Sequence, residues 1–196
     1  MRAVRRVTGR GLPLDRADVD TDQIIPAHWL KRVERTGYAA GLFEAWRRDP
    51  AFVINDPRYA GASILIAGPN FGCGSSREHA VWALDEAGFR AVIAPRLADI
   101  FRANCLKSGL VPVELEADAV ATLLRLVEKD PRTEITVDVE RRIVEAPGVR
   151  ASFALDEHAR DRLLQGLDEI AVTLAHVPEI TAYETTRAAW LPSVRD

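Results

Sequence analysis

Short apolar runs alternate with helical segments between Ser63 and Leu115, and this alternation constrains the fold more than any other feature of the sequence. Gly68 follows the first run, Pro95 follows the second and Gly109 ends the helix before the third, and Gly and Pro commonly end regular elements. Strands that alternate with helices of about ten residues are typical of parallel β/α units. We therefore predict strand, helix, strand, helix and strand, in this order, over residues 63–67, 76–87, 90–94, 97–107 and 111–115.

The segments on either side follow a different pattern. We expect a strand within residues 1–12, a polar turn from Asp15 to Asp22 and a helix from Leu42 to Arg48. After a helix at 118–129, the pattern predicts three antiparallel strands at 134–139, 142–146 and 150–155. A long amphipathic helix at 157–175 and an irregular tail with Pro178 and Pro192 are expected to follow. The predicted fold is a single α/β domain over 1–196, with a mixed parallel and antiparallel sheet, helices packed on it and a C-terminal helical part at 157–196.

The charge pattern argues against several classes of partner. The 26 basic and 29 acidic residues are interspersed, whereas a nucleic-acid surface needs a clustered basic face. No apolar stretch approaches the roughly 20 residues that cross a bilayer, and the N-terminus lacks the apolar core of a signal peptide. We therefore expect a cytoplasmic protein that binds neither nucleic acid nor membrane.

Cysteine usage limits cofactor binding. The two cysteines, Cys73 and Cys105, do not form a disulfide framework in a chain of this size. They are also too few for an iron–sulfur cluster, which takes three or four thiolates. Asp20 and Asp22 flank a threonine, and we interpret this pair as part of a turn rather than as a metal site. We therefore predict that this chain alone binds no metal or cofactor.

The segment Gly68–Ala80 carries the clearest chemical signal. It has the order of a strand, a glycine turn and a helix N-terminus, and Gly72 and Gly74 allow backbone to approach a ligand closely. Free N–H groups and the dipole at a helix start favour an anion, and Arg77 can bind a carboxylate through two donors. Phosphate is less favoured, because neither phosphate-loop sequence pattern is present. The segment predicts a site for a small carboxylic acid.

A simpler interpretation of the same residues is structural. Ser75 and Glu78 have the spacing of a helix capping box, in which a serine contributes about 1 kcal/mol of stability. Cys73 fits a turn residue and His79 a hydrogen-bonding residue on a helix face. A serine-nucleophile enzyme is disfavoured, because the segment lacks the Gly-x-Ser-x-Gly elbow. The local pattern therefore leaves both a catalytic and a structural role open.

Residues 70–80, Asn-Phe-Gly-Cys-Gly-Ser-Ser-Arg-Glu-His-Ala, resemble the signature of the swivelling domain of the aconitase superfamily. The isopropylmalate dehydratase small subunits are the nearest branch. Further segments match in the family's order, at 20–26, 52–55, 88–95, 98–101 and 109–113. The resemblance covers about half of the chain, most strongly residues 18–115. Arg96-Leu97 and Cys105-Leu106 depart from the family's usual Ser-Phe and Cys-Phe, which we interpret as differences in the core.

The resemblance implies roles for individual residues. Ser75 matches the serine that takes a proton from a substrate carbon. Ser76 and Arg77 match residues that bind substrate carboxylate, and Asp22 matches an aspartate at the edge of the active site. The loop that differs between family members by substrate corresponds to Lys31, Arg32, Val33, Glu34, Arg35, Thr36 and Gly37. Arg32 is the candidate that meets a substrate carboxylate, and Arg35 is the alternative.

The resemblance also implies an activity. It is that of a hydro-lyase subunit, which isomerises 2-isopropylmalate to 3-isopropylmalate by dehydration and rehydration in leucine biosynthesis. Turnover would require a large subunit carrying a 4Fe-4S cluster and a small dicarboxylic hydroxy acid as substrate. Helix amides and Arg77 would stabilise the Ser75 alkoxide. Two alternatives stay open: a related hydro-lyase acting on homoaconitate or on methyl-substituted maleate or malate, and a non-catalytic carboxylate-binding module.

Overall fold

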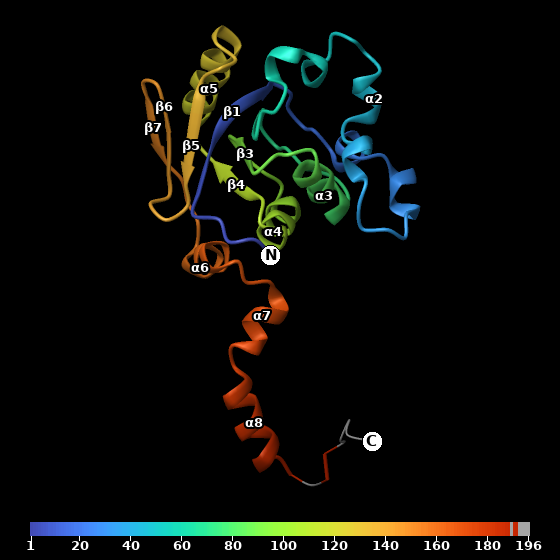
Figure 1. Cartoon of the computed structure of the whole chain (residues 1–196), viewed down its shortest axis with the longest axis vertical. Helices are drawn as coiled ribbons and strands as arrows, with labels where there is room; N and C mark the ends of the chain where they lie inside the picture. Colours follow the sequence, from blue (N-terminus) through green and yellow to red (C-terminus); the bar gives the residue numbers. More distant parts are fainter. Residues whose placement is uncertain (189, 192–196) are drawn as a thin grey trace.

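One mixed sheet of seven strands forms the centre of the computed structural model, which describes residues 1–188, 190 and 191 (Figure 1). The strands lie in the order β4-β3-β2-β1-β5-β6-β7. Neighbours from β4 to β1 are parallel and neighbours from β1 to β7 are antiparallel. The predicted mixed α/β fold is therefore confirmed. The strand bounds are β1 (Arg6–Leu14), β2 (Ile64–Ala67), β3 (Ala91–Ala94), β4 (Val111–Glu114), β5 (Glu134–Asp138), β6 (Ile143–Ala146) and β7 (Val149–Ser152).

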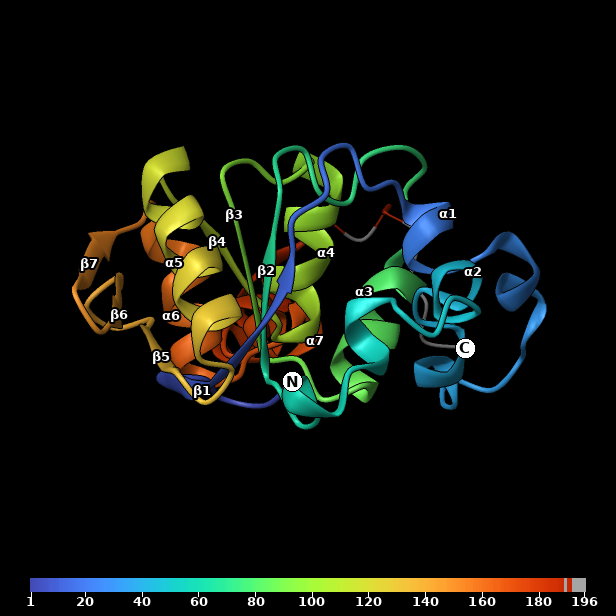
Figure 2. The same ribbon diagram turned by 90° about the horizontal axis from the view of Figure 1, so that it is seen from above.

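Two cores lie on opposite faces of this sheet. Successive side chains of a strand point to opposite faces, so Leu65 enters one core and Ile66 the other. Every residue of β2 and β3 is buried, as a sheet covered on both faces requires. Figure 2 shows α3 (Glu78–Glu86) and α4 (Asp99–Ser108) on one side of the strands, with α5 (Ala117–Lys129) and α6 (Glu157–Gln165) on the other. Within the described part of the chain, no helix has the length and apolar character needed to cross a membrane.

The switch from parallel to antiparallel pairing occurs at β1, where Arg6 lies opposite Asp138 of β5. The Asp138 side chain is buried and accepts hydrogen bonds of 2.8 Å from the Arg6 guanidinium and 2.8 Å from the Arg141 N–H. Burial raises the pKa of Asp138, but these donors outweigh it and hold the pKa below its usual value. The carboxylate is therefore a charged, fully engaged part of the fold.

Irregular structure between β1 and β2 covers the α3 side of the sheet. It contains α1 (Thr21–Ile24), α2 (Glu44–Arg47) and the 3₁₀ turns η1 (Ala27–Lys31), η2 (Tyr38–Gly41), η3 (Val53–Asn55) and η4 (Pro57–Tyr59). The expectation of a turn up to Asp22 was wrong, because α1 begins inside it. Asp20 accepts from the Gln23 N–H while the Gln23 side chain accepts from the Asp20 N–H, which closes a capping box. The helix predicted at 42–48 is shorter than expected, because Phe43 has a φ of 51° and α2 starts after it.

The strands and helices predicted between residues 63 and 155 are all present, with ends shifted by a few residues. The helix predicted at 157–175 is instead interrupted. Gly166 ends α6 with a φ of 71°, and Asp168 starts α7 (Glu169–Leu174) by accepting from the Ala171 N–H at 2.8 Å. The tail predicted to be irregular contains α8 (Val177–Thr186), with Pro178 in its first turn, where a missing N–H is tolerated. Pro192 lies outside the described residues.

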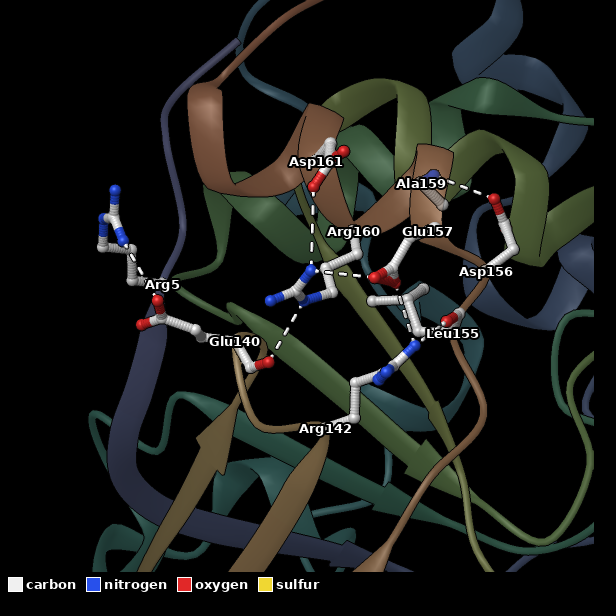
Figure 3. A network of polar contacts seen from close by, with 9 residues as sticks. All are labelled: Arg5, Glu140, Arg142, Leu155, Asp156, Glu157, Ala159, Arg160 and Asp161. Atoms are coloured by element: carbon white, nitrogen blue, oxygen red, sulfur yellow. Dashed lines mark hydrogen bonds and ion pairs between the residues drawn. The ribbon is translucent and has the colours of Figure 1, made fainter.

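A network of charged side chains joins α6 to the antiparallel strands (Figure 3). The Arg160 side chain donates to the Glu140 carbonyl at 3.1 Å and contacts Glu157 at 3.2 Å. Arg142 donates to the Leu155 carbonyl and to Glu157, both at 3.1 Å. These contacts lie largely at the surface and each contributes little to stability. They link the start of α6 to the turn between β5 and β6.

Candidate functional site

Ser75 lies on an exposed loop between the carboxyl end of β2 and the start of α3. Ser76 beside it is also exposed. The predicted capping box was wrong, because α3 begins at Glu78 with Arg77 as its N-cap and no side chain caps it. Arg77 is extended, with φ −134° and ψ 102°, so Ser75 lies two residues before the cap. Within the described residues the Ser75 hydroxyl makes no hydrogen bond, and it is therefore open to an incoming ligand.

Backbone contacts with the segment before α1 fix this loop. The Val19 carbonyl accepts from the Gly72 N–H at 2.7 Å and the Cys73 N–H at 3.2 Å. The Thr21 N–H donates to the Cys73 carbonyl at 2.9 Å, and the Thr21 hydroxyl donates to the Ser75 carbonyl at 2.8 Å. Thr21 is 2% exposed. Sequence reasoning missed this role of Thr21, although the Asp20-x-x-Gln23 spacing signals a helix that starts there.

A close contact under the loop explains one of its glycines. Gly72 has a φ of 79°, and a Cβ at this position would lie 2.2 Å from Cγ of Phe101. Phe101 on α4 also packs against Phe71 with the rings at 78°. Glycine is therefore required at 72 both by the backbone conformation and by the ring beneath it. Gly74, with a φ of 85°, then turns the chain outward to Ser75.

Asp22 and Arg77, 55 residues apart, form a two-pronged ion pair, and Arg77 directly follows Ser76 in the chain. Both terminal nitrogens of Arg77 donate to the Asp22 carboxylate, one of them at 2.7 Å, and the guanidinium also donates to the Ile25 carbonyl at 3.2 Å. The Arg77 side chain is 11% exposed and the Asp22 side chain 56%. A guanidinium has five N–H donors, so these three bonds leave two for a substrate. The structure thus brings together Asp22, Arg77 and the Ser75 loop.

Two titratable neighbours of Ser75 stay uncharged at neutral pH. Burial raises the pKa of the Cys73 thiol, and the charges of Asp20 and Asp18 raise it further. Burial lowers the pKa of His79 below its usual value of 6.5. The His79 ring packs against Tyr38 at 5.3 Å and Trp82 at 4.6 Å, measured between ring centroids. Cys73 therefore supplies no thiolate, and His79 brings no second positive charge to stand beside Arg77.

The loop 31–37 is exposed along its whole length. The Arg32 guanidinium lies over Trp29 at 5.5 Å and over Tyr38 at 5.9 Å, and these two rings are neighbours at 6.5 Å. Arg35 lies instead over Trp82 of α3, at 5.9 Å. The two candidate arginines thus stack on different aromatic rings. In the part of the chain that the structure describes, no three His, Cys, Asp or Glu side chains gather as a metal site.

Known proteins are similar to this chain in sequence and in fold. Residues 1–118 match the family model of the aconitase C-terminal domain. The chain is 61% identical over 186 residues to the 3-isopropylmalate dehydratase small subunit of Parafrankia sp. (strain EAN1pec), covering 95% of both chains. It is 53% identical over 194 residues to that of Rubrobacter xylanophilus, covering 99% of this chain and 100% of the relative. The crystal structure of 3-isopropylmalate dehydratase (leuD) from Methanocaldococcus jannaschii aligns with a TM-score of 0.64 at 26% identity, covering 91% of this chain and 99% of that one.

Proposed function

The chain belongs to the 3-isopropylmalate dehydratase small subunits of the aconitase family, and from this premise we propose that it completes an enzyme converting 2-isopropylmalate to 3-isopropylmalate. The reaction is a dehydration followed by a rehydration. It is a step of leucine biosynthesis, and we place it in the cytoplasm. The observation that carries the proposal is the exposed Ser75 hydroxyl on the same loop as Arg77, whose side chain is only 11% exposed. The whole chain acts as one swivelling domain that presents this loop to a larger partner.

Ser75 is the proposed base. Removing a weakly acidic proton from carbon needs a strong base, and a serine alkoxide is strong enough. The hydroxyl loses its own proton to water near neutral pH only if the negative charge of the oxygen is stabilised. Because no side chain caps α3, its first N–H groups remain available to an anion. Arg77 adds a fixed positive charge in the same loop. Preorganised donors of this kind stabilise oxyanions more effectively than water does.

Ser76 and Arg77 bind a substrate carboxylate in this proposal, and Asp22 orients Arg77. The bonds to Asp22 and to the Ile25 carbonyl leave two N–H donors of Arg77 unused. We therefore propose that Asp22 keeps the guanidinium plane fixed while substrate binds at its other edge. In this proposal the loop 31–37 contacts the part of the substrate that differs between acids and so sets substrate specificity. Arg32, over Trp29, is the proposed contact there, and Arg35 over Trp82 is the alternative.

The proposed 4Fe-4S cluster belongs to the large subunit. A cluster takes three or four thiolates, whereas this chain has two cysteines, of which Cys105 is fully buried in the core. When bound, the cluster would supply a Lewis acid for the departing hydroxyl group. This chain's own part is to bind the acid, orient it and remove the proton.

Reconstitution tests the proposal. The purified chain is expected to be colourless and inactive alone, and the large subunit from the same organism should restore isopropylmalate turnover when the two are combined. Homoaconitate and methyl-substituted maleate and malate serve as competing substrates in the same assay. Turnover of one of these acids without isopropylmalate turnover would move the assignment to a related hydro-lyase. Tight acid binding by the isolated chain, with no assembly and no turnover, would show a carboxylate-binding module instead.

A further inference from the structure

The part of the loop that carries Ser75 is held by few contacts. Gly74, Ser75 and Ser76 are all exposed and belong to no helix or strand. Within the described residues, the only hydrogen bond to any of the three comes from the Thr21 hydroxyl, which donates to the Ser75 carbonyl at 2.8 Å. The position of Ser75 therefore depends on a single side chain that lies 54 residues earlier in the sequence.

Thr21 is itself held firmly in place. It is 2% exposed and is the first residue of α1, and its carbonyl accepts from the Ile25 N–H at 2.9 Å. The capping box of Asp20 and Gln23 fixes the start of the same helix. A buried hydroxyl at a fixed helix start has little freedom to move, so it determines where the Ser75 carbonyl lies.

The segment at Thr21 lies directly behind the turn at Gly74. The Thr21 N–H donates to the Cys73 carbonyl at 2.9 Å, so Thr21 contacts the loop through its backbone and through its side chain. A Cβ added to Gly74 would lie 3.4 Å from Cβ of Asp20 and 3.8 Å from Oγ1 of Thr21. Backbone hydrogen bonds thus align the loop as far as Cys73, whereas the next step, to Ser75, depends on the Thr21 hydroxyl.

Arg77, two residues after Ser75, is held independently of this contact. Its guanidinium donates to the Asp22 carboxylate and to the Ile25 carbonyl. Thr21 and Asp22 are neighbours on α1, so this short helix contacts the chain both before and after Ser76. Loss of the Thr21 hydroxyl would therefore release Ser75 and leave the Arg77 guanidinium in place.

We propose that Thr21 is a positioning residue, whose hydroxyl sets the location of the Ser75 oxygen for proton removal. The inference rests on the proposed function, in which Ser75 is the base. A misplacement of about 1 Å at a reacting group can lower the rate about 10²-fold, and hydrogen bonds from a rigid element limit such movement. Because Thr21 is buried, it acts through the loop and not on the substrate.

The test compares variants of Thr21 in the full chain, assembled with the large subunit. Thr21→Val removes the hydroxyl and keeps a side chain of similar shape, whereas Thr21→Ser keeps the hydroxyl and removes a methyl group. We expect Thr21→Val to lower kcat about 10- to 100-fold and to change KM less than about threefold, since Arg77 stays in place. Thr21→Ser should keep kcat within about threefold of the unaltered enzyme. A contact needed for stability alone would lower the melting temperature and leave kcat of the assembled enzyme unchanged.

Thr8→Val is the chemically matched control. The Thr8 hydroxyl also forms a hydrogen bond, at 3.0 Å with the hydroxyl of Thr136, but this pair joins β1 to β5. Thr8 lies near the amino end of β1, whereas the Ser75 loop follows the carboxyl end of the parallel strand β2. The same chemical change at this position should leave kcat and KM within about twofold.

Folding and assembly of each variant are checked by circular dichroism and gel filtration. Should Thr21→Val fail to fold or to assemble, Thr21→Ala and Thr21→Ser supply the comparison, because these two variants differ by one oxygen atom. Thr21→Ala should then show the loss of kcat expected for Thr21→Val, and a kcat equal to that of Thr21→Ser would overturn the inference.

A double-mutant cycle shows whether Thr21 acts through Ser75. If it does, adding Thr21→Val to Ser75→Ala should lower the residual kcat less than about twofold, because the group to be positioned is already gone. A full additional loss in the double variant, an unchanged kcat in Thr21→Val, or an equal loss in Thr21→Ser would overturn the inference and leave the proposed function standing. Failure of the unaltered chain to give isopropylmalate turnover with the large subunit would instead refute the proposed function.

Discussion

Replacing Ser75 by alanine separates the catalytic role of this residue from a structural one. The side chain is exposed, lies two residues before the N-cap of α3 and makes no hydrogen bond within the described residues. Its removal should therefore change the free energy of unfolding by less than about 0.5 kcal/mol. A base that removes a proton from carbon contributes far more to the rate. We expect Ser75→Ala to lower kcat about 10³-fold, equivalent to about 4 kcal/mol of activation free energy.

The assay compares Ser75→Ala with Ser76→Ala in the assembled enzyme. The two serines are adjacent and both exposed, so they make a matched pair for folding and assembly. Ser76→Ala should act mainly on KM, because a group that binds substrate and transition state alike changes binding rather than kcat. Chemical denaturation of each variant supplies the stability comparison. A kcat for Ser75→Ala within tenfold of the unaltered enzyme, with assembly kept, would refute the assignment of the base.

Three further tests address the site and its scaffold. Arg77→Lys keeps the charge but loses the planar fork, so KM for isopropylmalate should rise about tenfold or more in steady-state assays; an unchanged KM would count against carboxylate binding. Gly72→Ala, with a Cβ 2.2 Å from Phe101, should lose about 2–4 kcal/mol of unfolding free energy. Gly88→Ala, with a φ of 102° and no atom within 4 Å, should lose only about 1 kcal/mol, and equal losses in denaturation would contradict the packing argument. Asp138→Asn should lose about 1–2 kcal/mol at pH 7. Because the folded pKa of Asp138 lies below the unfolded value of about 3.9, this loss should shrink as denaturation is repeated at pH values falling below about 4, and a pH-independent difference would contradict it.

The parallel half of the fold is predictable because its signals are local. The apolar runs around Ile64, Val92 and Val111 are short and buried on both faces, and glycines or prolines mark their ends. Each strand pairs with the next one along the chain. Nothing in these runs shows that β1 inserts between β2 and β5, because that order depends on pairing across most of the chain. Sequence periodicity predicts the strands and helices, whereas the position of β1 within the sheet depends on tertiary packing.

The candidate site, like the fold, was predictable only where its signals are local in the sequence. Ser75, Arg77 and Asp22 were all singled out from motifs, but the contact between Asp22 and Arg77 spans 55 residues and has no local signature. The start of α3 was misplaced because Ser75 and Glu78 have the spacing of a capping box, yet the loop needs extended residues to reach the segment at Thr21. A backbone held by another segment thus overrode a local propensity. The break at Gly166 was missed for the opposite reason, since a single glycine within a helical pattern is often tolerated.

Because Ser75 is exposed to solvent in this chain, the proposed base needs a second chain to cover it. In water, the dielectric constant weakens the field of Arg77 and of the α3 amides, so an alkoxide at an exposed serine gains little from them. The same donors act far more strongly where water is excluded. Arg77 is already largely shielded and held by Asp22, while the oxygen that it would stabilise remains open to solvent. A partner surface that covers the loop would therefore let Ser75 ionise to its alkoxide without moving any residue of this chain. On this argument assembly makes the Ser75 alkoxide available, and the isolated subunit is expected to be inactive even when its loop is fully formed.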